Sequence, residues 1–349
     1  MKIQENIALA PFTTLGIGGP ARWFVAASSE AEVTEACAWA RERDVPLFVL
    51  GGGSNVLVAD AGFGGLALHV ALKGVEQDGE VYRVAAGEIW DSFVQRAVEN
   101  GCAGVECMAG IPGTVGGTPV QNVGAYGQEV ASVIERVRVF DLKTETFVEL
   151  GNADCGFAYR RSRFNTVDRG RHVVTRVDYR LRQNGASWLE YQDLKTHLKD
   201  SAQAPSLAEV ADAVREIRRG KGMLANETLI AEGDPDCRSA GSFFKNPSVA
   251  PEEAERVWQI AADSGVPLRI FPSGDGRVKV PAAWLIEQSG FRKGYALGNA
   301  GISSRHTLAL VNRGGATAAE ILALEKRIRA AVEAKFGIRL EMEPEMVGF

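Results

Sequence analysis

The sequence predicts an α+β protein built from more than one domain. Strand-like runs, either apolar or alternating, recur between segments that have the spacing of amphipathic helices. The chain has 349 residues, which is more than one hydrophobic core usually fills, so two or three domains are expected. Apolar residues make up 46% of the chain and charged residues 24%, close to an average globular protein, so the chain is expected to fold.

The N-terminal part is expected to contain a helix followed by a buried strand. Ser28 and Ser29 can cap a helix whose apolar residues keep helical spacing, and the apolar run 47–50 follows Pro46. Further strands are expected at 56–58, 66–70 and 81–85, and a helix over 90–100 is expected to end at Gly101.

The remaining elements alternate between sheet and helix. Residues 133–150 alternate like two strands paired around 141–144, and 173–181 has the pattern of another strand. A helix over 206–219 is expected to end at Gly220, and the Gly-, Asp- and Pro-containing segment 222–238 is expected to be a loop and a domain boundary. The last elements are expected to be helices near 251–264, 282–289 and 318–336 and a strand at 307–311.

Composition argues against several classes of function. The formal net charge is -5 and the basic residues are mixed with acidic ones, so no nucleic-acid partner is expected. No apolar run is long enough for a signal peptide or a membrane span. The five cysteines show no CxxC spacing and the four histidines show no metal-ligand spacing. We therefore expect a cytoplasmic protein with reduced thiols and no metal site.

Two short glycine runs are ambiguous. Residues 16–21 fit G-x-G-x-x-A superficially, but a strand-like run follows them where a dinucleotide-binding fold needs a helix, so a tight turn is favoured. Residues 51–53 are three glycines after a buried strand, without the Lys of a phosphate-binding P-loop. They could receive phosphate oxygens on exposed amides or form a flexible hairpin turn, and the segment by itself does not decide between these.

The stretch 109–127 is the most informative part of the sequence. Its glycines are interleaved with Ile111, Val115, Ala125 and Tyr126, which a disordered linker would not contain. A plain surface loop would not need so many positions without side chains. A backbone that wraps closely around a flat, phosphate-bearing ligand does need them.

Several separated motifs resemble the UDP-N-acetylenolpyruvoylglucosamine reductase (MurB) family, in the order that the family has. These are TLGIGGPA at 14–21, GGGSN at 51–55, AGIPGTVGG and the following residues to 127, FAYRRSRF at 157–164, GSFFKNP at 241–247, and Pro344-Glu345. The resemblance spans nearly the whole chain. A tyrosine in the segment 190–194 resembles the tyrosine loop of the first type of the family.

The resemblance implies a vanillyl-alcohol-oxidase-like (PCMH-type) FAD-binding region of two subdomains and a C-terminal α+β substrate-binding domain. The expected boundaries are 1–70 with the tail 337–349 returning to it, 71–221, and 222–336. The implied reaction reduces the enolpyruvyl ether of UDP-N-acetylglucosamine to UDP-N-acetylmuramate, a step of peptidoglycan precursor synthesis, with NADPH. Relatives of that fold attach FAD through His or Cys beside the first glycine loop, where this chain has Ser54 and Asn55, so non-covalent FAD is expected.

Three residues match the catalytic positions of the family. Arg160 is implied to polarise the substrate carboxylate, which suits a guanidinium because it stays charged and binds carboxylates in bidentate fashion. Ser242 is implied to give a proton to C2 after a hydride arrives at C3. Glu345 is implied to orient or protonate the intermediate, and its spacing from Gly337 favours it over Glu343. Without the resemblance, Arg160 would be interpreted as a surface arginine.

The resemblance also assigns binding residues. Those implied to hold FAD are Gly51, Gly52, Gly53, Ser54, Asn55, Ile111, Pro112, Gly113, Gly116, Gln121, Asn122, Gly124 and Ala125. Those implied to hold the sugar nucleotide are Tyr126, Tyr191, Lys221 and Asn246. The long segment after Lys221 leaves Lys245 or an arginine as alternatives to it, and the basic residue that the family often has after Glu345 is absent.

Two other functions fit parts of the same pattern. An oxygen-using flavin oxidase would keep the glycine loops but has no reason to carry GSFFKNP or Lys221. A non-catalytic flavin or sugar-nucleotide binding protein has no reason to combine Arg160, Ser242 and Glu345. The sequence therefore favours the enolpyruvyl reductase, and a monomer is expected.

Overall fold

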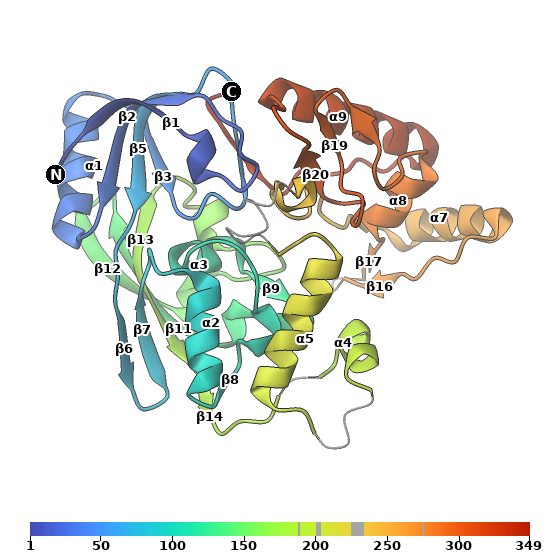
Figure 1. Cartoon of the computed structure of the whole chain (residues 1–349), viewed down its shortest axis with the longest axis horizontal. Helices are drawn as coiled ribbons and strands as arrows, with labels where there is room; N and C mark the ends of the chain where they lie inside the picture. The colour runs from blue at the N-terminus through green and yellow to red at the C-terminus, as the bar shows by residue number, and fades with distance from the viewer. Residues whose placement is uncertain (188, 200–203, 225–233, 274–275) are drawn as a thin grey trace.

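The computed structural model describes residues 1–187, 189–199, 204–224, 234–273 and 276–349. Figure 1 shows an N-terminal sheet with helix α1 beside it, a second sheet next to α2 and α5, and a C-terminal region of helices and short strands. This arrangement confirms the predicted α+β fold. Of the predicted loop 222–238, residues 225–233 lie outside the described residues.

The N-terminal sheet has the strand order β1-β2-β5-β3, in which β2, β5 and β3 are parallel and β1 is antiparallel to β2. The predicted first helix is confirmed as α1 (Glu30–Glu42), and Ser29 caps it by accepting a hydrogen bond from the Glu32 N–H at 3.2 Å. The strands are β1 (Gln4–Ala8), β2 (Pro20–Ala27), β3 (Leu47–Leu50) and β5 (Phe63–Val70).

The C-terminal tail returns to this N-terminal region. β21 (Glu345–Val347) pairs in parallel with β4 (Val56–Val58), and the Glu345 N–H donates to the Asn55 carbonyl at 2.9 Å. β4 directly follows residues 51–55, so this pairing brings the carboxylates of the tail next to the first glycine loop.

The second sheet is antiparallel and has the strand order β12-β11-β13-β7-β6. The predicted hairpin around 141–144 is confirmed as the connection between β11 and β12. The sequence analysis did not predict β6, which is mostly exposed and therefore lacks an apolar pattern. The strands are β6 (Val75–Asp78), β7 (Val81–Ala85), β11 (Ile134–Asp141), β12 (Thr146–Gly151) and β13 (His172–Arg180).

Helices α2 (Trp90–Glu99) and α5 (Leu207–Gly220) contribute to the core of this second part. Trp90 is fully buried and its Nε1–H donates to the Met108 carbonyl at 3.1 Å. The Gly- and Pro-rich stretch contains only short elements, as the sequence predicts. They include β8 (Cys102–Ala103), α3 (Thr118–Gln121), β9 (Gly124–Ala125) and β10 (Gln128–Glu129), while β14 (Arg182–Gln183) pairs with β8 and α4 (Gln192–His197) precedes α5.

The C-terminal region has its own apolar core, around Phe243, Leu285, Ile321 and Ile328. The predicted strand at 307–311 begins only at Leu310, because residues 303–309 form a turn in which the Ser303 N–H donates to the Ala309 carbonyl at 2.9 Å. The elements are β15 (Ser248–Val249), α7 (Pro251–Ser264), β16 (Phe271–Pro272), β17 (Val278–Lys279), α8 (Ala282–Gln288), β18 (Ala296–Leu297), β19 (Ala300–Ile302), β20 (Leu310–Asn312) and α9 (Ala318–Phe336).

Candidate active site

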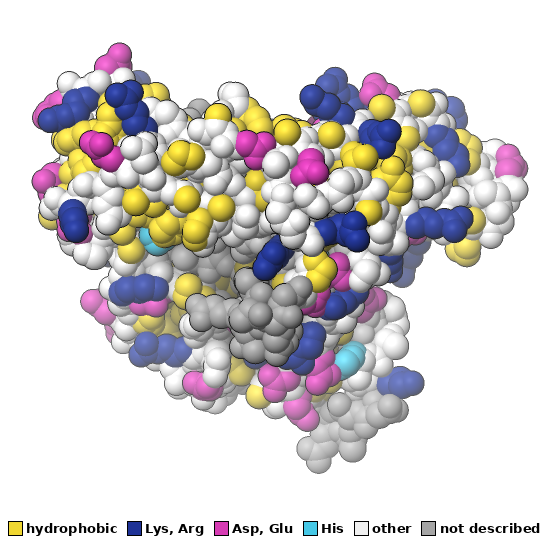
Figure 2. All heavy atoms as spheres, turned by 45° about the horizontal axis from the view of Figure 1, so that its top comes forward, with side chains coloured by type: hydrophobic (Ala, Val, Ile, Leu, Met, Phe, Trp, Pro, Cys, Tyr) yellow, Lys and Arg dark blue, Asp and Glu magenta, His cyan; other side chains and the backbone are white. Residues whose placement is uncertain are grey.

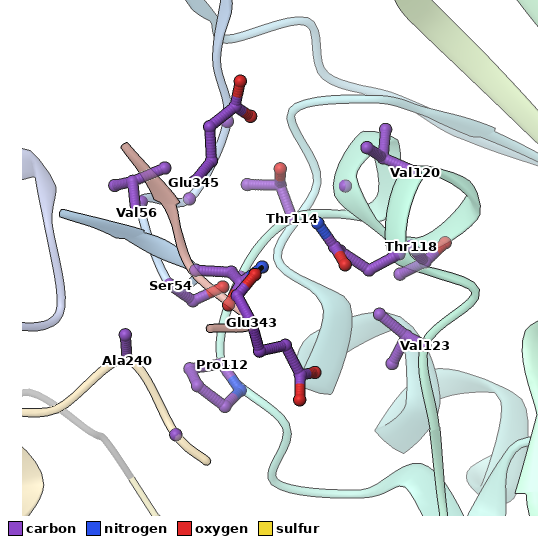
Figure 3. Close-up of a pocket in the computed structure, with 18 of the residues that line it drawn as sticks. Ser54, Val56, Pro112, Thr114, Thr118, Val120, Val123, Ala240, Glu343 and Glu345 are labelled. Carbon is purple, nitrogen blue, oxygen red and sulfur yellow. Dashed lines mark hydrogen bonds between the residues drawn. The ribbon is translucent and has the colours of Figure 1, made fainter. Parts of the chain in front are cut away.

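A cavity of about 520 Å³ lies where the three parts meet. Its walls come from β3 and residues 51–56, the stretch 111–124, residues 159–174, and the segments 239–246 and 343–345. Figure 3 shows Ser54, Thr114, Ala240 and Glu343, which come from distant segments, around the same space. The volume is in the range of cavities that bind cofactors and other organic ligands.

The two glycine-rich loops approach each other backbone to backbone in this cavity. A Cβ on Gly52 would lie 2.6 Å from the Gly113 Cα, so the first loop could not carry a side chain at this point. Gly53 serves the fold itself, because its φ is +60° and a Cβ there would lie 1.8 Å from the Phe12 carbonyl oxygen. Of the two interpretations of residues 51–53, the structure favours a ligand-facing loop, since all three glycines line the cavity.

Two buried polar atoms in the cavity wall have no hydrogen-bond partner among the described residues. They are the Thr114 Oγ1 and the His172 Nδ1. An orphaned buried polar atom is costly, so a bound molecule is expected to supply the missing partners. FAD fits this wall: its phosphates can accept from the Thr114 hydroxyl and from loop amides, and its adenosine offers several hydrogen-bonding atoms.

Most residues that the sequence predicts for FAD line this cavity. Asn122 is different, because it is buried and its side chain bonds to the protein: its Nδ2 donates to Glu129 Oε2 at 2.9 Å and to the Ala158 carbonyl at 3.0 Å. Ala125 pairs with Gln128 between β9 and β10. The lining residues of the predicted set are Gly51, Gly52, Gly53, Ser54, Asn55, Ile111, Pro112, Gly113, Gly116, Gln121 and Gly124.

Arg160 lies in the cavity wall in a fixed orientation. Its Nη2 donates to the Gly124 carbonyl at 2.8 Å, and its Nε lies 3.2 Å from Glu343 Oε1. Its φ is +54°, a left-handed backbone that costs energy for a residue with a side chain. The surrounding structure therefore holds the Arg160 guanidinium in place, although the backbone of this residue is strained and its charge is partly buried.

Glu343 and Glu345 both line the cavity but have different surroundings. Glu343 has a side chain that is 17% exposed, and burial raises the pKa of its carboxyl although Arg160 and Lys245 oppose the shift. Glu345 is 42% exposed and lies 3.2 Å from Arg169 Nη2. In Figure 3 the two side chains point away from each other. The sequence analysis preferred Glu345, and no feature of the sequence alone reveals which of the two contacts Arg160.

Tyr126, Tyr191 and Lys221 form a second group outside the main cavity wall. The rings of Tyr126 and Tyr191 meet edge to face with centroids 5.4 Å apart, and the Lys221 Nζ lies 5.7 Å from the Tyr126 ring centre. Burial alone would lower the pKa of Lys221, but the hydrogen bond from its Nζ to Asp193 Oδ2 at 2.9 Å helps to raise it above its ordinary value. The structure therefore brings these three predicted residues together, with the Lys221 ammonium group beside the Tyr126 ring.

Ser242 and Asn246 line the main cavity from the opposite, C-terminal side. Asn246 is held by its Oδ1, which accepts a hydrogen bond from the Ala282 N–H at 2.9 Å. Lys279, which the sequence analysis did not single out, lies with its Nζ 3.6 Å from the centre of the Tyr159 ring. Burial lowers the pKa of Lys279, and the charge of Arg160 lowers it further while Glu129 opposes the shift.

Within the described parts of the chain, no group of three or more His, Cys, Asp or Glu side chains is placed to hold a metal ion. The same described residues include no helix that is both long and apolar enough to cross a bilayer.

Comparison with known proteins agrees with the predicted family. A family model described as UDP-N-acetylenolpyruvoylglucosamine reductase, C-terminal domain, matches residues 234–347, and one described as FAD binding domain matches residues 21–151. These matches confirm the predicted FAD-binding fold with a C-terminal domain.

Relatives align over the whole length of the chain. UDP-N-acetylenolpyruvoylglucosamine reductase of Thermobifida fusca is 48% identical over 99% of this chain and 98% of its own, and that of Streptomyces coelicolor is 46% identical over 99% and 91%. The crystal structure of UDP-N-acetylenolpyruvylglucosamine reductase (MurB) from Thermus caldophilus superimposes with a TM-score of 0.67 at 28% identity over 99% of both chains. The chain therefore belongs to the UDP-N-acetylenolpyruvoylglucosamine reductase family.

Proposed function

We propose that this chain reduces the enolpyruvyl ether of UDP-N-acetylglucosamine to UDP-N-acetylmuramate, with non-covalent FAD in the cavity and NADPH as the reductant. The observation that carries the proposal is the meeting of Arg160, Ser242 and a tail carboxylate, from three distant segments, in one cavity lined by both glycine loops. Bound FAD supplies the chemistry of carrying a hydride from NADPH to the substrate.

Arg160 is proposed to bind the substrate carboxylate. Its guanidinium already faces a carboxylate in the structure, since Glu343 lies 3.2 Å from its Nε. A guanidinium binds carboxylates in bidentate geometry and stabilises the negative charge that develops when a hydride adds to the adjacent double bond. The bond from Arg160 Nη2 to the Gly124 carbonyl fixes that charge before the substrate binds.

Ser242 is proposed to donate the proton that completes the reduction. It lines the cavity on the C-terminal side, whereas the glycine loops line it on the N-terminal side, so a substrate between them would have the hydroxyl on one face. Proton donation by a positioned side chain is what the α-carbon of such an intermediate requires.

We place the third catalytic group, a carboxyl, at Glu343 in preference to Glu345. Glu343 lies beside Arg160 and is the more buried of the two, and burial raises the pKa of its carboxyl, which favours the protonated form that a proton donor needs. Glu345 lines the same cavity, but it is more exposed and pairs with Arg169. The role of Glu345, which the resemblance implies, stays a prediction.

The diphosphate of the substrate is proposed to bind between Tyr126, Tyr191, Lys221 and Asn246. Lys221 supplies a positive charge, and the tyrosines supply hydroxyl donors. Lys279 is a further cation for this site, because it lies over Tyr159 near Arg160 and can replace the basic residue that is absent after Glu345.

We also propose domain boundaries, a cellular location and an oligomeric state for this chain. We propose the boundaries 1–70 with 337–349, 71–221 and 222–336, supported by the pairing of β21 with β4. We further propose a cytoplasmic monomer without a nucleic-acid partner. Its support is the net charge of -5 and the mixed charges on the face in Figure 2.

Anaerobic stopped-flow absorbance tests the proposed function. NADPH should bleach the flavin, and only the enolpyruvyl nucleotide should restore its colour in the absence of oxygen. A flavin oxidase would be re-oxidised by oxygen and would ignore the nucleotide, and a non-catalytic binding protein would not be bleached at all. Acid precipitation should leave the yellow colour in the supernatant, because the FAD is not covalently attached.

A further inference from the structure

A turn near the N-terminus, residues 12–17 (the junction turn), bonds to two separate parts of the cavity wall. The Thr14 N–H donates to the carbonyl of Gly53, in the first glycine loop, at 3.1 Å. The Thr14 hydroxyl donates to the Ser239 carbonyl at 2.6 Å, 225 positions away in the chain. Both partners line the cavity. Thr14 therefore bonds to the loop proposed to hold FAD and to the segment that carries the proposed proton donor.

The junction turn is held by its own hydrogen bonds and by the C-terminal core. The buried Thr13 hydroxyl accepts a hydrogen bond from the Ile17 N–H at 3.3 Å. Leu15 and Ile17 are buried in the apolar core of the C-terminal region, and Asn312 Nδ2 donates to the Leu15 carbonyl at 3.0 Å. Because the position of Thr14 is fixed in this way, its hydroxyl can orient a partner at little entropic cost.

The bond from Thr14 reaches the proton donor through one tight turn. Ser239 is buried, and its Oγ accepts a hydrogen bond from the Gly241 N–H at 3.3 Å. Gly241 has a φ of +70°, a left-handed backbone that glycine adopts without strain, and it directly precedes Ser242. A shift of the Ser239 carbonyl would therefore move the Ser242 hydroxyl with it.

On the side of the first glycine loop, the bond from Thr14 fixes the orientation of one peptide group. A trans peptide is planar, and its C=O and N–H point in opposite directions. Because the Gly53 carbonyl faces Thr14, the N–H of Ser54 is turned away from the junction turn. Ser54 lines the cavity, so this bond helps to set how the loop presents its backbone to a ligand.

We propose that Thr14 is a positioning residue, which sets the distance between the first glycine loop and the proton donor Ser242. The inference rests on the proposed function, in which the substrate carbon lies between FAD and the Ser242 hydroxyl. A misplacement of about 1 Å, caused by a change away from the reacting atoms, can slow such a step by about 10²-fold. Hydride transfer from NADPH to the flavin needs no proton from Ser242, so it should not depend on the Thr14 hydroxyl.

Separate measurement of the two half-reactions tests this role. Thr14→Val keeps the backbone N–H and loses the hydroxyl, so FAD content and flavin reduction by NADPH should stay within about twofold of the parent. Anaerobic single-turnover re-oxidation by saturating enolpyruvyl substrate should slow by about 10- to 100-fold. Thr14→Ser restores the hydroxyl and should re-oxidise within about threefold of the parent.

Two further variants complete the comparison. Thr34→Val is the matched control, because it removes a hydroxyl that donates to the Glu30 carbonyl within α1, and it should keep both rates. Thr14→Ala removes the hydroxyl without placing a methyl group against the Ser239 carbonyl. It should show the same difference between the half-reactions even if the Val variant does not fold.

The inference is overturned if the variants without the Thr14 hydroxyl re-oxidise at the parental rate, or if they slow both half-reactions by the same factor. It is also overturned if Thr14→Val slows Ser242→Ala as much as it slows the parent, because its effect should pass through Ser242. If the parent is not re-oxidised by the enolpyruvyl nucleotide, or if Ser242→Ala re-oxidises normally, the proposed function is wrong. That result differs from failure at Thr14 alone.

Hydrogen exchange of the oxidised holoenzyme gives a readout that does not depend on turnover. In Thr14→Val, a peptide that covers 239–245 should exchange faster than in the parent, because the turn before Ser242 has lost a hydrogen bond. A peptide that covers 51–58 should exchange as in the parent, since the Thr14 N–H still bonds to the Gly53 carbonyl. Parental exchange in 239–245 would show that Thr14 does not hold this turn.

Discussion

Arg160 and Glu343 form an ion pair inside the cavity, with 3.2 Å between Nε and Oε1, although they come from the middle and the end of the chain. The pairing of β21 with β4 brings the tail to the cavity, while Arg160 is held by the carbonyl of Gly124. A cation and a carboxyl with a raised pKa therefore face the same space before any substrate binds.

Glu343→Gln should lower kcat by about 10²- to 10³-fold, because it removes the carboxyl closest to Arg160. Glu345→Gln, two residues away and on the same cavity, is the comparison variant, and it should lose less activity than Glu343→Gln if Glu343 is the catalytic carboxyl. Steady-state rates at saturating substrate, with thermal midpoints to confirm folding, give the comparison. A large loss in the Glu345 variant with a nearly normal Glu343 variant would return the role to Glu345.

Gly117→Val should yield protein with little FAD. Gly117 lines the cavity and has no atom within 4 Å of its ideal Cβ, so the new side chain would occupy ligand space without meeting the protein. Gly64, on an exposed part of β5, also has open space and is the matched control, since Gly64→Val should keep its FAD. The measurement is the ratio of flavin to protein absorbance in folded samples. Full occupancy in the Gly117 variant would remove residues 115–117 from the FAD site.

Substitutions at Gly53 or Gly124 would not give this information. A Cβ on Gly53 would lie 1.8 Å from the Phe12 carbonyl oxygen, and one on Gly124 would lie 2.6 Å from the Gln128 carbonyl oxygen. These variants would lose FAD because the fold is damaged.

Lys221→Ala should mainly raise KM for the UDP substrate, because it removes a contact that is present in both the ground state and the transition state. Asp193→Asn is the comparison variant. It removes the carboxylate that binds Lys221 at 2.9 Å, so it should leave KM unchanged or lower it. Initial rates over a range of substrate concentrations measure both. A collapsed kcat with unchanged KM in Lys221→Ala would show that another cation, such as Lys245, holds the diphosphate.

Asp141→Asn should destabilise the fold in a pH-dependent way. The Asp141 carboxylate is 4% exposed and accepts from Arg171 Nη2 at 2.6 Å, and this hydrogen bond holds the pKa of its carboxyl well below the usual range. A carboxyl with a depressed pKa stabilises the fold above its unfolded pKa of about 3.9, and this contribution is lost as the pH falls toward the folded value. The variant should lose about 1–3 kcal/mol at pH 7, and this loss should begin to shrink as the pH falls below about 4.

Thermal unfolding of both proteins between pH 3 and pH 7 measures this difference. Asp78→Asn is the control. The Asp78 side chain is 76% exposed, and its Oδ2 lies 3.5 Å from Arg83 Nη2, so its charge should contribute little to stability. A loss of stability at Asp141 that is equal at pH 3 and pH 7 would mean that the charge of the carboxylate is not its cause.

The sequence by itself determined the fold class, the main helices and the family. Helices such as α1 and α5 could be predicted because their caps and apolar spacing are local properties. The glycine-rich stretch 109–127 could be assigned to a ligand because a backbone without side chains is itself a local signal. The five motifs before the tail likewise carried the residue types that the chemistry needs, at fixed spacing within each motif.

Only the tertiary structure decided which residues meet. It placed Glu343 beside Arg160, Thr14 against Ser239 and Lys279 over Tyr159, none of which the sequence pattern indicates. It also showed that the Asn122 side chain bonds to the Ala158 carbonyl and that Gly53 is required by the approach of Phe12. Each of these contacts joins segments that are distant in the chain, and such distances are set by strand pairing and core packing, which no local pattern of residues records.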